Sequence, residues 1–152
     1  MTRVVLLDTG PLGLVTHPKA ETKNEKAVRW LRGLLSDGVD VLIPEIADYE
    51  LRRELLRAGK TRSVAVLDRY KTSLGYVPLT TEVMLQAAEF WASVRQQGKP
   101  TAPDPALDGD VILAGQAAML GRGGDDVVIA TTNVGHLSRF VPAQEWEYVG
   151  ST

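Results

Sequence analysis

Near its start the chain reads Val4-Val5-Leu6-Leu7-Asp8-Thr9-Gly10-Pro11, an apolar run followed at once by an acid and a predicted turn. Four consecutive apolar residues, two of them β-branched, are typical of a strand buried on both faces of a parallel sheet. Gly10 and Pro11 then predict a turn directly after the strand. We therefore expect Asp8 at the carboxyl end of a buried strand, which is where open α/β sheets bind their ligands.

Outward from this strand, short apolar runs alternate with stretches of helical periodicity. Further strands are predicted at 39–43, 76–79, 127–130 and 146–149, and helices at 24–36, 46–58, 62–74, 81–97 and 107–120. The segment 99–105 carries three prolines and is predicted to be an ordered, non-helical loop. Strands that alternate with helices indicate parallel βαβ units. The expected fold class is α/β, with a central parallel sheet flanked by helices in a single domain, 1–152.

The helix at 81–97 has the clearest apolar stripe of the chain. Its expected buried face consists of Met84, Ala87, Ala88, Trp91 and Val94, and Gly98 follows it as a stop signal.

The composition excludes several classes of protein. The 152 residues fit one domain, and 44% hydrophobic with 24% charged residues is ordinary for a soluble globular protein. The absence of cysteine excludes disulfides, thiolate zinc sites and cysteine nucleophiles. No run approaches the ~18 apolar residues that span a membrane, and the first apolar run is too short for a signal peptide. We expect a cytoplasmic protein without membrane contact.

Two acids stand out as candidate ligands, each with a simpler interpretation beside it. Asp8 must be paired, hydrogen-bonded or bound to a cation, yet it also fits a cap on the turn formed by Thr9 and Gly10. Glu50 lies on a predicted helix with Arg53 on the same face. It suits a metal beside a phosphodiester, or else a solvated ion pair with Arg53.

A second acidic region, Asp108-Gly109-Asp110, is predicted to open a helix. Two residues apart inside a helix, the carboxylates would point to nearly opposite sides, so they converge only if Asp108 is the N-cap. Asp110 is therefore the stronger candidate ligand, and Asp108 a cap first and a ligand second. Asn133, after the strand at 127–130, is either an amide ligand or a turn residue.

These motifs together resemble the PIN-domain family, which includes the VapC-like toxins of bacterial toxin–antitoxin pairs. The resemblance rests on Leu6-Leu7-Asp8-Thr9-Gly10-Pro11, the helix carrying Glu50, Asp110-Val111-Ile112-Leu113-Ala114 and Val128-Ile129-Ala130-Thr131-Thr132-Asn133, in that order over nearly the whole chain. It implies a three-layer PIN-like fold and a metal site of Asp8, Glu50 and Asp110, with Asp108 and Asn133 secondary. Asn133 departs from the usual aspartate, which should weaken a second metal site.

The resemblance implies a metal-dependent endoribonuclease, the toxin of a type II pair. Clustered carboxylates repel one another unless a proton or cation intervenes, and Mg²⁺ or Mn²⁺ is the natural partner for their oxygens. RNA, an antitoxin protein and a second copy of the chain are the partners that it implies. Beside Glu50, phosphate contacts are expected from a basic patch, which is otherwise a solubilising face: Arg52, Arg53, Arg57, Lys60 and Arg62.

Two other functions stay open from the sequence. With Asn133 in place of an acid, the chain could be a catalytically weak binding module. A phosphotransfer domain similar to haloacid-dehalogenase-like phosphatases is less compatible, because no second aspartate stands two positions after Asp8. The histidines, His17 and His136, are predicted to be surface residues in loops.

Overall fold

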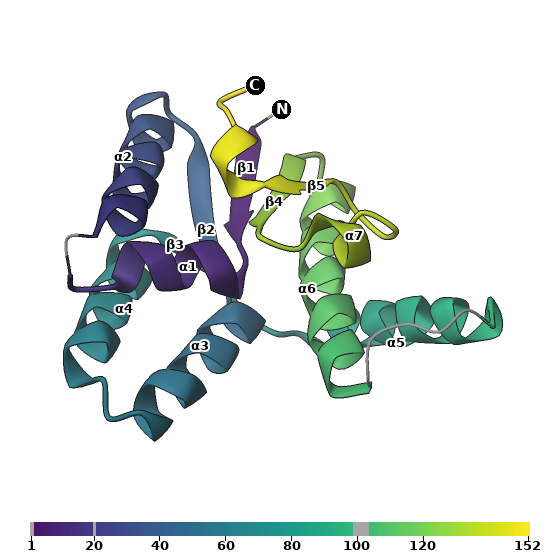
Figure 1. The fold of residues 1–152 in the computed structure, drawn as a ribbon. Coiled ribbons are helices and arrows are strands. Elements are labelled where there is room, and N and C mark those ends of the chain that lie inside the picture. Colours follow the sequence, from purple (N-terminus) through teal and green to yellow (C-terminus); the bar gives the residue numbers. More distant parts are fainter. Residues whose placement is uncertain (1, 20, 99–103) are drawn as a thin grey trace.

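A five-stranded parallel sheet forms the centre of the computed structural model, which describes residues 2–19, 21–98 and 104–152 (Figure 1). Within these ranges the strand order is β3-β2-β1-β4-β5, and every neighbouring pair is parallel. The expected parallel α/β sheet is therefore confirmed. Its strands are β1 (Arg3–Leu7), β2 (Asp40–Pro44), β3 (Gly75–Val77), β4 (Asp126–Thr131) and β5 (Ala143–Glu145).

Helices cover both faces of this sheet. The helices of the described chain are α1 (Thr9–Thr16), α2 (Thr22–Ser36), α3 (Glu45–Arg57), α4 (Thr61–Ser73), α5 (Thr81–Gln96), α6 (Asp104–Arg122) and α7 (Val134–Leu137), with a 3-10 turn η1 (Trp146–Tyr148). In Figure 1, α1 to α4 lie on one side of β1 and α5 to α7 on the other. None of the described helices is both long and apolar enough to cross a membrane.

The alternation of side chains along β1 explains the three layers. Val5 and Leu7 pack into a core with α1 and α2, whereas Val4 and Leu6 pack into a second core with α6 and α7. Successive side chains of a strand point to opposite faces, so a strand that is apolar at every position needs a helical layer on each side. This is the reason that the run in β1 is continuous rather than alternating.

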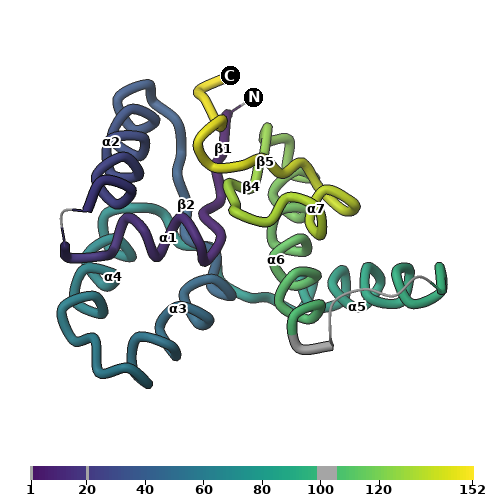
Figure 2. The backbone as a smooth tube through the Cα atoms, viewed as in Figure 1, coloured from purple at the N-terminus to yellow at the C-terminus, as the bar shows by residue number. Residues whose placement is uncertain are grey.

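The central place of β1 brings the ends of β1 and β4 together. Leu7 pairs with Ala130, and the amide of Asp8 donates to the Ala130 carbonyl at 3.0 Å. Figure 2 traces the chain from the end of β1 into α1 and from the end of β2 into α3, at the same edge of the sheet. Residues that directly follow these strands are therefore gathered at that edge.

The predicted turn after β1 is wrong, because the chain enters α1 there without a loop. Asp8 is the N-cap of this helix and accepts from the Thr9 amide at 2.7 Å. Pro11 is compatible with the helix because first-turn amides have no intrahelical carbonyl partner. The proline that suggested a turn is therefore the third residue of α1.

Two other boundaries differ from the prediction. The helix expected from 107 begins at Asp104, so the last two residues of the predicted loop 99–105 are helical, while 99–103 lie outside the described residues. The strand expected at 146–149 is wrong as well. Trp146 is buried against the edge of the Trp30 ring, at 5.4 Å between centroids, and starts η1 after the short strand β5.

The buried face of α5 consists partly of other residues than those predicted. Ala87 and Val94 are buried as expected, but Met84 and Trp91 are 45% and 37% exposed. A Cβ on Gly115 would lie 2.8 Å from the Val83 carbonyl oxygen, so α5 and α6 cross with almost no space between their backbones. This close crossing buries the Val83 side of α5 and leaves Met84 and Trp91 at the surface.

Candidate active site

Asp8 is held by hydrogen bonds to both of its carboxylate oxygens. The Thr9 amide donates to Oδ1 and the Thr131 hydroxyl donates to Oδ2, each at 2.7 Å. Thr131 is fully buried, and its own oxygen accepts from the Asn133 amide at 3.0 Å. Asp8 therefore caps α1, as the simpler interpretation stated, and is oriented from β4 as well. A carboxylate oxygen offers more than one lone pair, so capping leaves Asp8 able to bind a cation.

Glu50 projects from α3 toward the start of α1. The Thr9 hydroxyl donates to its Oε1 at 3.0 Å. Burial raises the pKa of Glu50, the Thr9 bond opposes this shift, and the charge of Asp8 adds to it. Glu50 is thus half-buried against α1 rather than a fully solvated partner of Arg53, whose guanidinium lies over the Tyr49 ring at 5.0 Å.

Asp110 projects from α6 and meets a histidine that was predicted to be a surface loop residue. His136 belongs to the short helix α7, and its Nδ1 lies 3.2 Å from Asp110 Oδ2. Burial raises the pKa of Asp110, and the His136 contact opposes this rise. The prediction of a loop is therefore wrong for His136, and the turn after β4 carries this residue back against α6, although its side chain is still 39% exposed. His17 is exposed, as expected.

The three acids of the predicted metal core influence one another electrostatically. The charge of Asp8 raises the pKa of Glu50 and of Asp110, and the charge of Asp110 also raises that of Glu50. The end of β1, α3 and α6 thus bring three distant carboxylates to one edge of the sheet. Like charges at this range favour protonation or a bound cation.

The donor atoms suit a hard divalent cation, although they are not arranged around one point. Carboxylate oxygens are the ligands that Mg²⁺ and Mn²⁺ prefer. Within the described residues, no group of three acidic or histidine side chains is in a geometry that would hold an ion as it stands. Binding would require the carboxylates to turn toward one another, and the charge of the cation would then offset both their repulsion and the cost of burying Glu50 and Asp110 in charged form.

Gly109 allows α3 and α6 to approach at this edge. A Cβ on Gly109 would lie 2.6 Å from Glu50 Oε2, closer than side chains ordinarily pack. The Glu50 carboxylate therefore rests against the backbone of α6, one residue from Asp110. A larger residue at this position would displace the end of the Glu50 side chain.

The two secondary candidates, Asp108 and Asn133, are held differently from the three core acids. Because α6 begins at Asp104, Asp108 is inside the helix and cannot be its N-cap, so the prediction of a cap is wrong. A separation of two helical residues directs Asp108 and Asp110 to nearly opposite sides, and Asp108 lines a cleft with Met84 and Trp91 of α5. Asn133 precedes α7 with an exposed side chain, and it contributes its backbone amide to Thr131.

The residues of the predicted basic patch do not form one surface, because Arg52 is turned inward. Arg52 points into the contact between α3 and α4, where it pairs with buried Asp48 at 3.0 Å and with Asp68 at 2.9 Å. Arg57 pairs with Glu54 at 2.7 Å on the surface. Arg53 stays exposed beside Glu50. The remaining members, Lys60 and Arg62, are exposed at the α3–α4 turn.

The structure adds four residues that the sequence did not single out. Thr9 and Thr131 orient Glu50 and Asp8, Gly109 makes room for Glu50, and His136 contacts Asp110. Thr9 had a signal, since it adjoins Asp8 after a buried strand. Thr131 had a similar signal, since it directly follows the apolar run 127–130. The roles of Gly109 and His136 depend on long-range contacts, which no local pattern reveals.

Comparison with solved structures shows the fold of VapC toxins. The chain is similar to DNA-bound VapBC from Salmonella typhimurium, with a TM-score of 0.70 and 21% identity over 96% of this chain and 99% of that one. It is similar to VapBC2 from Rickettsia felis bound to a promoter DNA fragment, with a TM-score of 0.69 and 15% identity over 93% and 97% of the two chains.

A third similar structure is VapC20 from Mycobacterium tuberculosis, described as a Sarcin-Ricin loop cleaving toxin. Its TM-score is 0.60, with 16% identity over 90% of this chain and 96% of that one. The expected PIN-like fold is confirmed by these likenesses. No protein-family model matches the amino-acid sequence, and no curated protein sequence matches it.

Proposed function

We propose that this chain is a cytoplasmic, Mg²⁺- or Mn²⁺-dependent endoribonuclease, acting as the toxin of a toxin–antitoxin pair. The observation that carries the proposal is the convergence of Asp8, Glu50 and Asp110 from three separate elements, close enough for Asp8 to raise the pKa of both others. A fold shared with VapC toxins supports the same conclusion. RNA rather than DNA follows from that likeness.

The chain's own residues hold the three carboxylates in place. Thr9 acts twice, because its amide binds Asp8 and its hydroxyl binds Glu50. Thr131 fixes Asp8 from β4, and His136 fixes Asp110 from α7. When bound among these oxygens, Mg²⁺ or Mn²⁺ would activate a water and stabilise charge on the phosphate being cleaved.

Two exposed arginines flank the carboxylates and suit the substrate's charge. Arg53, on α3, lowers the pKa of Glu50, and Arg139, which follows α7, lowers the pKa of Asp110. Each is therefore within electrostatic range of one acid. Arginines in such positions would hold the RNA backbone without reading its bases.

The test combines a cleavage assay with melting in the presence of metal. Asp8→Asn should abolish RNA cleavage and leave the melting temperature nearly unchanged, since asparagine caps a helix about as well as aspartate. Mg²⁺ or Mn²⁺ should stabilise the wild type, by ~2.7 kcal/mol at a hundred times the dissociation constant. Asp110→Asn should remove this stabilisation. Full cleavage by Asp8→Asn would refute the assignment.

Asp108→Asn is the matched control for the melting experiment. It makes the same chemical change on the same helix, but its side chain lines the cleft against α5. We expect it to retain the stabilisation by metal. If Asp108→Asn and Asp110→Asn lost that stabilisation equally, the ligand set would have to include Asp108.

The proposed partners are an antitoxin and a second copy of the chain. VapBC2 and VapBC are the complexes whose structures this chain resembles. For the homodimer, α5 presents Met84, Leu85 and Trp91 with 45%, 63% and 37% of their surfaces exposed. Exposed apolar side chains grouped on one helix are characteristic of association surfaces. Leu85→Glu should then shift the species seen by size-exclusion chromatography from dimer to monomer.

A binding module without cleavage is the second candidate. It is favoured by the exposed Asn133 where the PIN-like pattern usually has an acid, and by the absence of a ready ligand set among the described residues. A wild type that binds RNA, but neither cleaves it nor responds to millimolar metal, would establish this alternative.

A further inference from the structure

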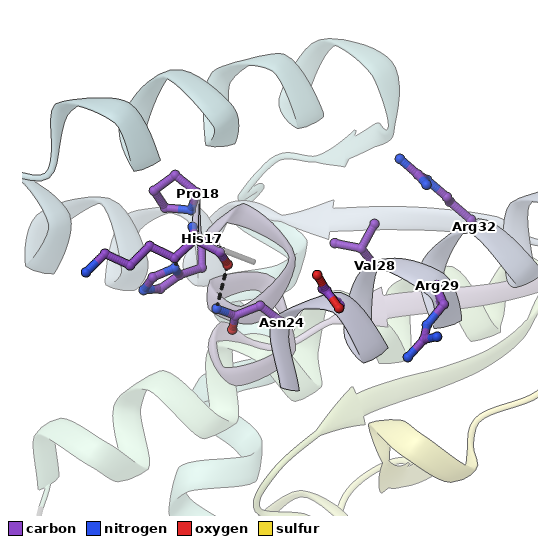
Figure 3. A pocket seen from close by; sticks show the side chains of 8 residues that line it. His17, Pro18, Asn24, Val28, Arg29 and Arg32 are labelled. Carbon is purple, nitrogen blue, oxygen red and sulfur yellow. Dashed lines mark hydrogen bonds between the residues drawn. The ribbon is translucent and has the colours of Figure 1, made fainter. Parts of the chain in front are cut away.

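A second charged feature lies away from the carboxylates, at the far end of α1. It is an open cleft of about 360 Å³ between the α1–α2 connection and the outer side of α2. Figure 3 shows His17 and Pro18 on one side and Arg29 and Arg32 on the other, with Val28 between them. The residues lining it are His17, Pro18, Lys19, Asn24, Glu25, Val28, Arg29 and Arg32.

Local hydrogen bonds shape the connection side of this cleft. Buried Asn24 donates from Nδ2 to the Lys19 carbonyl at 3.1 Å, and the Lys19 amide donates to His17 Nδ1 at the same distance. Both bonds fix the backbone around Lys19 rather than its ammonium group. These side chains thus position the backbone of Lys19, while its ammonium group forms no ion pair with a described residue.

The cations of the cleft lack counterions among the described side chains. Arg29 and Arg32 are exposed, and neither they nor Lys19 forms an ion pair with a described residue. Lys26, on the same helix, is paired with Glu147 at 2.6 Å. In a protein with net charge −2, this concentrates an excess of positive charge at one place.

The chemistry of the lining suits phosphates better than an acidic peptide. Arg29 and Arg32 are one helical turn apart on one face, so their guanidinium groups can reach neighbouring anions. The cleft is lined by one acid, Glu25, and by three cations, Lys19, Arg29 and Arg32. Peptides are usually anchored by apolar side chains in pockets, whereas two of the eight residues that line this cleft, Pro18 and Val28, are apolar.

The position of the cleft relates it to the carboxylates. α1 is capped by Asp8 at one end and leads to His17 at the other, and its eight residues span ~12 Å. A stacked strand that rises about 3.4 Å per nucleotide along its axis, as in a duplex, would cover this length in three to four nucleotides. We propose that the cleft binds the phosphodiester backbone of the RNA substrate, several nucleotides from the cleaved bond. This extends, and rests on, the proposed ribonuclease function.

The test measures RNA binding without cleavage, by fluorescence anisotropy in EDTA. Two labelled oligouridylates are compared, one of about four nucleotides and one of about twenty. Each single-strand phosphate contact changes the slope of log K against log salt by about 0.7, which is ~5-fold in affinity at ~0.1 M salt. Arg29→Gln/Arg32→Gln should therefore weaken the long probe ~25-fold and reduce its salt slope by about 1.4. Binding of the short probe should weaken as well, because about four nucleotides are enough to occupy the cleft alone.

The matched control is Lys23→Gln/Arg69→Gln, which removes two exposed charges from α2 and α4 outside the cleft. It should leave binding of the long probe nearly unchanged. Arg32→Gln alone, at an exposed helical position, should give about half of the logarithmic effect. Melting curves confirm that each variant is folded.

Several results would overturn the inference. They are an unchanged affinity of the double variant for the long probe, an equal loss in the control, no binding of RNA by the wild type, or displacement of the long probe by oligoglutamate at equal concentration. Because EDTA removes metal, the two proposals fail separately. A protein that cleaves nothing but loses binding through Arg29 and Arg32 refutes only the nuclease.

Discussion

Gly109→Ala provides a direct test of the geometry at the acidic cluster. The added Cβ would lie 2.6 Å from Glu50 Oε2, and ordinary contact begins at 3.4 Å, so the carboxylate must move by at least 0.8 Å. The end of a flexible side chain can make this move cheaply. Alanine also favours a helix over glycine by about 0.8–1 kcal/mol. The variant should fold at least as stably as the wild type.

Function should nevertheless fall sharply in this variant. A displacement of about 1 Å in a reacting group can reduce a rate ~100-fold. We expect Gly109→Ala to cleave RNA about 100-fold more slowly and to show a smaller rise in melting temperature with Mn²⁺. Circular dichroism melting and single-turnover cleavage of a labelled RNA measure the two effects on the same preparation.

Two other glycines of α6 are matched controls. A Cβ on Gly121 meets nothing within 4 Å, so Gly121→Ala should change neither cleavage nor the response to metal. A Cβ on Gly115 would lie 2.8 Å from the Val83 carbonyl, a backbone atom. Gly115→Ala should therefore lose about 1–3 kcal/mol of stability through overpacking. A folded Gly109→Ala variant with undiminished cleavage and metal response would refute the placement of Glu50 against α6.

Three further predictions follow from the contacts of single side chains. The pKa of Glu50 is raised in the fold, so its contribution to stability is complete below its unfolded pKa and is lost as pH rises through the folded pKa. Without metal, Glu50→Gln should accordingly raise the melting temperature at neutral pH, by about 2–4 °C for each kcal/mol by which the folded state is stabilised. An unchanged melting curve would contradict the cost of burying the Glu50 charge beside Asp8. His136 lowers the pKa of Asp110, so His136→Ala should move the acidic limb of the pH–activity profile to higher pH. It should also reduce metal affinity ~10–100-fold. A profile with lower activity but the same pH dependence would show that His136 only packs against Asp110. Arg52→Ala leaves buried Asp48 with the Tyr76 hydroxyl at 2.9 Å and the Lys71 ammonium at 3.9 Å, and should cost about 1–3 kcal/mol in urea unfolding. Arg53→Ala should change stability little and weaken RNA binding.

Much of the fold could be predicted because its signals are local. The run in β1 is apolar at every position, so it predicts burial on both faces, and the structure places a helical core against each face. Helices α3, α4 and α5 begin and end within one residue of their expected bounds. Gly59 supports one of these ends, since its φ of +68° is a left-handed conformation that favours glycine after a helix.

The errors arose where a local signal had two structural uses. Proline marks a turn, but it also fits the first turn of a helix, as Pro11 does in α1. Apolar Trp146 suggested a strand, but its burial comes from packing against Trp30 of α2. In both cases the choice depends on what the rest of the chain places beside the segment.

The sequence by itself determined that this chain forms a parallel α/β sheet with Asp8 at the end of a buried strand. Only the tertiary structure decided that β4 lies beside β1, which brings Thr131 to Asp8, and that α6 lies where Glu50 contacts Gly109. It also turned Arg52 inward and His136 onto Asp110. The physical reason is range: hydrophobic periodicity acts over a few residues, whereas strand order and helix crossings join side chains up to 123 positions apart.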